Sequence, residues 1–317
     1  MREAGYRRFV DNLKLVYEFV PGSTIDSNPI NMQGFNDSEF ALEKPRGVVR
    51  IAMLGDSITQ GSYVPARDNF SEKLESLLNE RARMRRIPTR YEVMNFGVGG
   101  YNLAAEVETL KEKVLPYEPD IVVLNMFSND NEPIPGVYLL FAGNQLRLTE
   151  EERLSLARRY VLNRDSLLRR FERDVLYRSK LYLLAVSTMH AKRDGAALSK
   201  VTDLSARVWE NMDVVEQGFR EISGLRKRHG FKFLICTHPW LFRDGNGNNP
   251  MFADIARKFD FESFHMLSHY GDLVERRSLR LKDHPRDDCH PNESGHALIA
   301  EALFLELKKR GLIDPRL

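Results

Sequence analysis

A serine, a histidine and an aspartate in this chain have the residue types of a nucleophilic hydrolase. Ser57 lies in a Gly-Asp-Ser triplet, while His290 and Asp287 stand near the C-terminus, with the aspartate three residues before the histidine. A serine hydroxyl is a weak nucleophile unless a nearby base takes its proton, and that base works best when a third group fixes its tautomer. One short turn would bring the Asp287 carboxylate to Nδ1 of His290 while Nε2 faces Ser57. We therefore predict a nucleophile, a base and an orienting acid, with Asp288 as the alternative acid.

Attack on an ester carbonyl creates an oxyanion, which needs preorganised hydrogen-bond donors. The sequence offers the backbone N–H of Ser57 at a helix start, the backbone N–H of Gly100 and the side-chain amide of Asn129. Gly97 and Gly99 are the alternatives to Gly100 in the same glycine-rich stretch. Simpler interpretations stand beside these roles, because serine is also a common helix N-cap and asparagine a common turn residue.

Secondary structure must bring these distant residues together, and the hydrophobic pattern predicts strands that alternate with helices. Apolar runs indicate strands at residues 49–55, 91–96, 120–126, 231–237 and 261–267. Helical spacing indicates helices at residues 70–86, 103–114 with Asn102 as N-cap, 208–229, 252–259 and 295–310. This alternation predicts right-handed βαβ units in a doubly wound parallel sheet. Ligands bind such sheets at the carboxyl ends of the strands, so the residues that follow strands are expected to do the chemistry.

Four blocks of sequence occupy such positions or precede the last helix: residues 55–61, 95–102, 127–131 and 287–296. Together, and in this order, they resemble the SGNH hydrolases, also called the GDSL esterase and lipase family, over residues 49–312. The resemblance implies a flavodoxin-like three-layer α/β/α sandwich with a central five-stranded parallel sheet. It also implies ester hydrolysis without a cofactor.

The same resemblance implies roles for individual residues. The family's Asp-x-x-His pair corresponds to Asp287 and His290, and its oxyanion hole combines the serine N–H with the glycine of the second block and the asparagine of the third, here Gly100 and Asn129. The third block often reads Gly-Gly-Asn-Asp in the family, whereas residues 127–130 read Phe-Ser-Asn-Asp. This departure keeps the amide and is expected to change the shape of the pocket.

The length of 317 residues fits one enlarged α/β domain. We expect residues 1–46 to form an irregular N-terminal prefix that packs on the core, and residues 47–317 to form the hydrolase domain, with a helical insertion at about 149–207. Residues 151–193 carry eleven Lys or Arg against five Asp or Glu. This basic insertion is typical of a solvated helical face, and contact with an anionic membrane surface or acidic polymer is the alternative.

Composition excludes several other partners. A net charge of +2 is far below the basic excess of a dedicated nucleic-acid binder. We see neither a transmembrane stretch nor a signal peptide, so the expected location is the cytoplasm, or outside it if an N-terminal anchor was removed. Neither a His-Glu-x-x-His nor a Cys-x-x-Cys motif occurs, so we predict no metal. The metal alternative would use His284, Asp287, Asp288, His290 and His296, and Cys289 is an alternative nucleophile beside the predicted base.

The resemblance implies a serine ester hydrolase. The prefix is similar to that of bacterial SGNH proteins associated with carbohydrate modification, and this likeness favours removal of O-acetyl or other short acyl groups from a carbohydrate or small molecule. A lipase or thioesterase acting on longer acyl chains and an O-acetyltransferase acting on a glycan are alternatives within the same fold. An inactive glycan-binding or assembly protein is the alternative outside enzymology.

Overall fold

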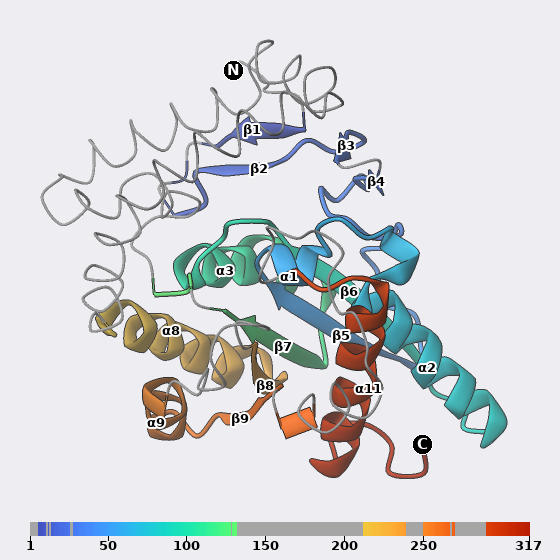
Figure 1. Ribbon diagram of the computed structural model, residues 1–317. Coiled ribbons are helices and arrows are strands. Elements are labelled where there is room, and N and C mark those ends of the chain that lie inside the picture. Colours follow the sequence, from blue (N-terminus) through green and yellow to red (C-terminus); the bar gives the residue numbers. More distant parts are fainter. Residues whose placement is uncertain are drawn as a thin grey trace, which may run out of the picture.

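The computed structural model of the protein describes residues 6–10, 12, 14–25, 28–127, 129–131, 212–238, 250–266, 268–269 and 290–317 (Figure 1). The predicted insertion at about 149–207 lies outside the described residues, and so do Asp287, Asp288 and Cys289.

A five-stranded parallel sheet forms the centre of the protein, as predicted. Its order is β6-β5-β7-β8-β9, which is the flavodoxin-like order in which the first strand of the sheet lies between the second and the third. The strands are β5 (Val48–Gly55), β6 (Arg90–Gly97), β7 (Ile121–Met126), β8 (Lys232–Thr237) and β9 (Glu262–His265). All six residues of β7 are buried, because helices cover both faces of the sheet.

Two layers of helices complete the sandwich (Figure 1). Helices α2 (Phe70–Met84) and α11 (Glu293–Lys309) pack together over one face of the sheet. Helices α3 (Leu103–Thr109) and α8 (Asp213–His229) cover the other face, and α9 (Pro250–Lys258) packs against α8. Side chains of the strands alternate between the two hydrophobic clusters, so Leu54 belongs to one and Met53 to the other. The predicted three-layer α/β/α class is confirmed.

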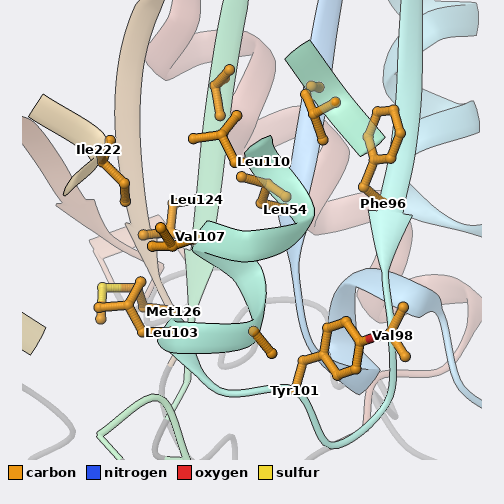
Figure 2. Packing of buried hydrophobic residues seen from close by; sticks show 14 of the residues in the cluster. Leu54, Phe96, Val98, Tyr101, Leu103, Val107, Leu110, Leu124, Met126 and Ile222 are labelled. Carbon is orange, nitrogen blue, oxygen red and sulfur yellow. The ribbon is translucent and has the colours of Figure 1, made fainter. Parts of the chain in front are cut away.

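The helix predicted at 103–114 is shorter than expected. Asn102 is its N-cap, as predicted, because its side chain accepts a hydrogen bond from Ala105 N–H. The α-helix ends at Thr109, whose hydroxyl bonds back to Ala105 O, and residues Leu110–Val114 (η2) continue as a π turn before the 3₁₀ turn Leu115–Tyr117 (η3). The apolar side chains are buried as the spacing predicted, since Leu103, Val107 and Leu110 all join the hydrophobic cluster between the sheet and the α3 and α8 layer (Figure 2).

The prefix consists of two short antiparallel hairpins. Strands β1 (Arg7–Phe9) and β2 (Tyr17–Phe19) form the first, and β3 (Thr24–Ile25) and β4 (Asn28–Pro29) form the second. Apolar side chains of this segment are part of the same cluster as α3 and α8, and they include Leu15, Val16, Tyr17, Phe19, Ile25, Ile30 and Phe35. The prefix is therefore built into the core on the α3 side.

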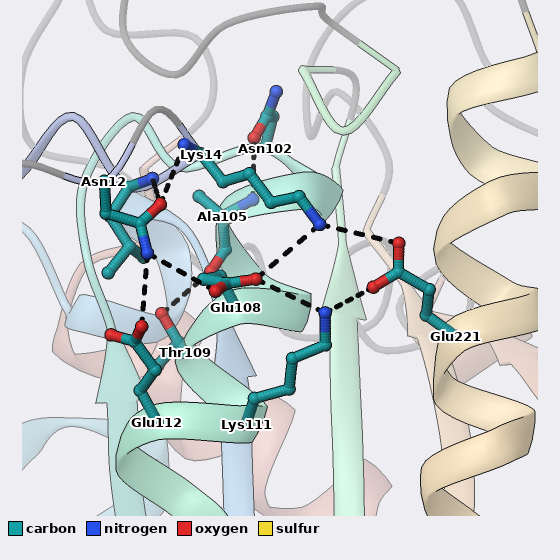
Figure 3. Close-up of polar contacts among 10 residues, drawn as sticks. Asn12, Lys14, Asn102, Ala105, Glu108, Thr109, Lys111, Glu112 and Glu221 are labelled. Carbon is teal, nitrogen blue, oxygen red and sulfur yellow. Dashed lines mark hydrogen bonds and ion pairs between the residues drawn. The ribbon is translucent and has the colours of Figure 1, made fainter.

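Polar contacts also fasten the prefix to the helices (Figure 3). Lys14 lies 3.6 Å from a Glu108 carboxylate oxygen and 3.5 Å from one of Glu221, so it bridges α3 and α8. Lys111 bridges the same two carboxylates, and the Asn12 amide donates to Glu108 at 3.3 Å. The prefix, α3 and α8 thus share one charged network at their outer edge.

A buried arginine holds the other end of the prefix. Arg50 of β5 is 0% exposed and pairs with Glu92 of β6 at 3.0 Å. Its guanidinium also donates to the carbonyl oxygens of residues 41–43 at 2.7–3.2 Å and to Tyr117 O at 2.8 Å. A buried charge is tolerated only when it is paired and fully hydrogen-bonded, and the chain just before β5 supplies those acceptors.

None of the helices in the described part of the chain is both long and apolar enough to cross a membrane.

Candidate active site

Ser57 is placed by a tight turn from β5 into the short helix α1 (Ser57–Gln60). The N-cap of this helix is Asp56, whose side chain accepts from Ile58 N–H at 2.9 Å. Ser57 is therefore not the cap, and the simpler interpretation of this serine is wrong. A side chain at Gly55 would stand 2.1 Å from Thr59 Oγ1, so the turn requires glycine at that position.

The structure brings Ser57 and His290 into contact. Nε2 of His290 lies 2.7 Å from Ser57 Oγ, which is hydrogen-bond distance for a nucleophile and its base. On the imidazole, the ring of Tyr63 packs edge-on, with centroids 5.4 Å apart and planes at 81°. Asp287 and Asp288 lie outside the described residues, so the choice of acid stays a prediction.

Helix α11 carries His290 to the serine from the far end of the sequence. The helix starts at Glu293, and its N-cap is Asn292, two residues after His290. Oδ1 of Asn292 accepts from Ser294 N–H and Gly295 N–H at 3.1 Å. His296 then docks the helix on α2, because its Nδ1 accepts from Phe70 N–H at 3.2 Å and its ring stacks on Phe70 at 5.7 Å. The prediction that Asn292 and His296 cap or anchor the last helix is confirmed.

His296 serves this purpose as a neutral imidazole. Burial lowers the pKa of His296 to about 3, because the charged form loses its hydration. Its Nδ1 lone pair therefore stays available as an acceptor for Phe70 N–H.

The last residue of β6 and the glycine-rich loop that follows it present three glycine backbone amides close to α1. Gly97 N–H donates to Asn95 Oδ1 at 2.9 Å and Gly99 N–H donates to Gln60 Oε1 at 2.8 Å. Among the described residues no acceptor is recorded for Gly100 N–H, and Gly100 has the positive φ of 85° that glycine tolerates best. Of the three, Gly100 is thus the amide that remains available to a ligand.

Asn129 lies just beyond β7 and is fixed to the same loop. Its Nδ2 donates to Tyr101 O at 2.6 Å, which ties the side chain to the residue after Gly100. The amide nitrogen carries two hydrogens, and this bond uses one of them. The three predicted oxyanion donors come from the ends of three adjacent strands, β5, β6 and β7.

Buried carboxyl groups lie beneath this site, and the sequence interpretation missed them. Burial raises the pKa of Asp56 to about 6. The hydrogen bond from Ile58 N–H and the charge of His290 act in the opposite direction and lower this pKa. Burial likewise raises the pKa values of Glu106 and Asp130 well above their usual range, and the charge of the nearby Asp130 raises that of Glu106 further. Two such groups in one dry site favour sharing a proton over carrying two charges. Asp130 sits in the third block, directly after Asn129, so its place was readable but its burial was not.

No group of three metal-ligating side chains occurs within the residues that the structure describes. Of the predicted metal alternative only His290 and His296 fall in that part of the chain, and each has a different partner.

The chain was compared with protein families, with curated proteins and with solved structures. The model of the GDSL-like lipase/acylhydrolase family matches residues 53–298. Sequence comparison with curated proteins finds no match.

Among solved structures, a two-domain esterase active on acetylated mannans is 18% identical with a TM-score of 0.48, and the match covers 83% of this chain and 49% of that one. The chain thus spans about half the length of that esterase. An acetyl xylan esterase is 14% identical with a TM-score of 0.45, over 82% of this chain and 100% of the other. An acetyl xylan esterase from Geobacillus stearothermophilus is 15% identical with a TM-score of 0.46, over 82% and 94%.

The matched segment contains both Ser57 and His290 as well as the whole parallel sheet except the first residues of β5. On the family match, and in agreement with its sequence blocks, this chain belongs to the GDSL-like lipase/acylhydrolase family.

Proposed function

We propose that the protein is a serine ester hydrolase in which Ser57 is the nucleophile, His290 the general base and acid, and Asp287 the residue that orients His290. The observation that carries the proposal is the 2.7 Å contact between Ser57 Oγ and His290 Nε2, formed by residues from opposite ends of the chain. Membership of an acylhydrolase family supports an ester as substrate.

The reaction follows from this contact. Ser57 Oγ forms a bond to the acyl carbon while its proton passes to His290 Nε2, and the carbonyl electron pair moves onto oxygen. The N–H groups of Ser57 and Gly100 and the amide of Asn129 hold that oxyanion. When the intermediate collapses, the bond to the alcohol breaks and His290 returns the proton to the leaving oxygen. A water molecule then repeats these steps on the acyl-serine and releases the acid.

A short acyl group on a carbohydrate or small molecule is the proposed substrate. Tyr63 supports it, because this ring is 65% exposed and packs on His290, where the leaving alcohol must stand. Its backbone has a φ of 71°, a conformation that is uncommon for a bulky residue. An exposed aromatic face with a hydroxyl at its tip suits an alcohol that has both apolar and polar surface, such as a sugar.

The proposal is tested with Ser57→Ala on p-nitrophenyl esters of increasing chain length and on an acetylated oligosaccharide. We expect the variant to lose at least about 10³-fold in kcat on every ester, and the wild type to prefer acetyl over octanoyl. Ser76→Ala, at an exposed serine on α2, is the matched control and keeps wild-type rates. Ser57→Ala with wild-type activity would remove the nucleophile from the proposal, and a preference for octanoyl esters would favour a lipase or thioesterase.

A further inference from the structure

The first hairpin of the prefix reaches the loop that carries Gly100. Tyr17 Oη donates to Gly99 O at 2.7 Å, and Arg7 Nη2 donates to the same oxygen at 3.4 Å. Both side chains are almost fully buried, at 2% and 5% exposure. These bonds join residues that are 82 and 92 positions apart, so they are long-range ties between the prefix and the loop.

The bonded oxygen and the Gly100 N–H belong to one peptide group. That peptide is trans, so its C=O and N–H point in opposite directions, and fixing the oxygen toward the hairpin turns the N–H away from it. The N–H of Gly99 is held on the other side by Gln60 Oε1 at 2.8 Å, and Gln60 belongs to the helix that Ser57 begins. The loop is thus clamped between the hairpin and α1.

Arg7 adds charge to this clamp. Its guanidinium carbon lies 5.1, 5.0 and 5.8 Å from the ring centroids of Tyr6, Tyr17 and Phe19, and in the described part of the chain no carboxylate forms an ion pair with it. Gly99 brings this cation close to the nucleophile, since a methyl group there would lie 3.5 Å from Ser57 Cβ and 3.7 Å from Arg7 Nη2. A buried cation that hydrogen-bonds a carbonyl polarises the whole peptide and strengthens its N–H as a donor.

We propose that Arg7 and Tyr17 are positioning residues of the active site, which fix and polarise the Gly99–Gly100 peptide so that Gly100 N–H is preorganised for the oxyanion. The inference rests on the proposed esterase function and deepens it, because it makes the prefix a working part of the catalytic centre. Neither residue contacts the reacting atoms; each acts through the peptide.

The neighbouring arginine provides a matched control. Arg8 lies in the same strand, but its side chain is 39% exposed and bonds to Glu18. A substitution at Arg8 therefore removes an equal charge from the same hairpin without touching Gly99.

The test compares Tyr17→Phe, Arg7→Met, Arg7→Lys and Arg8→Met in the full chain, with kcat and KM for p-nitrophenyl acetate and the thermal midpoint of each. We expect Tyr17→Phe and Arg7→Met to lower kcat about 10-fold each with KM changed less than about 2-fold, since weakening a donor costs less than the ~100-fold of removing one. Arg7→Lys keeps the charge and recovers part of the loss, while Arg8→Met keeps wild-type kcat.

Two results would overturn the inference: wild-type kcat in Tyr17→Phe, or equal kcat losses in Arg7→Met and Arg8→Met. Tyr17→Phe removes one oxygen atom and keeps the buried ring, so it remains decisive even if Arg7→Met fails to fold. Failure of the inference is separate from failure of the function, because Ser57→Ala stays inactive in the first case and active in the second.

Discussion

The candidate active site is assembled from two regions that are held in place by different forces. The contact between Ser57 and His290 depends on apolar packing, because α11 lies on α2 through side chains such as Leu298 and Leu303, which are 3% and 0% exposed. The loop that carries Gly100 depends on a few buried hydrogen bonds from the prefix and α1. Hydrophobic packing is spread over many atoms, whereas each of those bonds fixes one peptide.

This difference separates stability from rate. Truncating an apolar side chain of α11 should lower the free energy of unfolding, while the reaction rate of each folded molecule stays nearly the same. Removing one polar group that bonds to the loop of Gly100 should leave the fold intact and reduce the rate of ester hydrolysis. The following substitutions test that separation, beginning with the largest expected effect.

The largest effect on kcat is expected at the acid that is proposed to orient His290. Asp287→Asn should lower kcat by about 10³–10⁴-fold, since an amide cannot hold His290 in the tautomer that accepts the serine proton. Asp288→Asn is the matched control and should stay within about 3-fold of wild type. The measurement is kcat on p-nitrophenyl acetate, and a larger loss in Asp288→Asn would transfer the role to the neighbouring aspartate.

The apolar support is tested within one helix. Leu303→Ala should lower the free energy of unfolding by about 2–5 kcal/mol, because Leu303 is fully buried, and should change kcat at 25 °C less than about 3-fold. Leu305→Ala, at a position that is 54% exposed, should cost less than about 1 kcal/mol. Urea unfolding beside enzyme assays checks both, and a loss of kcat in Leu303→Ala that exceeds its loss of folded fraction would break the separation.

The buried carboxyl group of Asp56 makes stability depend on pH. Its pKa is raised by burial from 3.8 to about 6, so the folded state binds a proton more tightly than the unfolded state. The cost of burying the charged form is therefore absent below about pH 4 and complete above about pH 6, and it amounts to about 3 kcal/mol. Stability from this group falls as the pH rises through that window.

Asp56→Asn removes the titrating group and keeps an oxygen to cap α1. The decrease in the free energy of unfolding between pH 4 and pH 7 should be smaller than in wild type by up to about 3 kcal/mol, measured by urea unfolding at both values. Asp254→Asn, at an exposed carboxylate, should leave the wild-type dependence unchanged. Parallel curves for wild type and Asp56→Asn would show that Asp56 has the same pKa in the folded and unfolded states.

The smallest effect is expected at Tyr63, the exposed ring that packs on His290. Tyr63→Gly should raise KM for an acetylated oligosaccharide about 10-fold and leave p-nitrophenyl acetate unchanged, because only the larger alcohol reaches the ring. The same change should raise stability by up to about 1 kcal/mol, since glycine adopts a φ of 71° without strain. Equal KM changes on both esters would show that Tyr63 acts on His290 rather than on the alcohol.

The elements that pack through apolar side chains could be predicted from the sequence far better than the buried hydrogen bonds that hold the loop of Gly100. The buried strand Ile121–Met126 and the helix with Asn292 as N-cap were readable, because periodicity and capping are local signals. The early end of α3 at Thr109 was missed, since a hydroxyl that bonds back to Ala105 O leaves no trace in apolar spacing. Ser57 and Gly100 could be selected from motifs that follow strands, and His290 from the motif that precedes the last helix.

Arg7, Tyr17 and Gln60 could not be selected in this way. Their contacts with Gly99 span long separations, and the prefix is irregular in pattern. Glu106 was equally hidden, because a glutamate in the first turn of a helix is ordinarily exposed and interacts with the helix dipole. Its burial beside Asp130 depends on tertiary packing alone.

The most direct test of the account is covalent labelling with a fluorophosphonate, followed by peptide mass spectrometry. We expect one label per chain, on Ser57, in the wild type, and a labelling rate at least about 10²-fold lower in His290→Ala, because the serine then has no base. A label on another residue, or an unlabelled chain that still hydrolyses p-nitrophenyl acetate, would contradict the assignment of Ser57 and His290 as nucleophile and base.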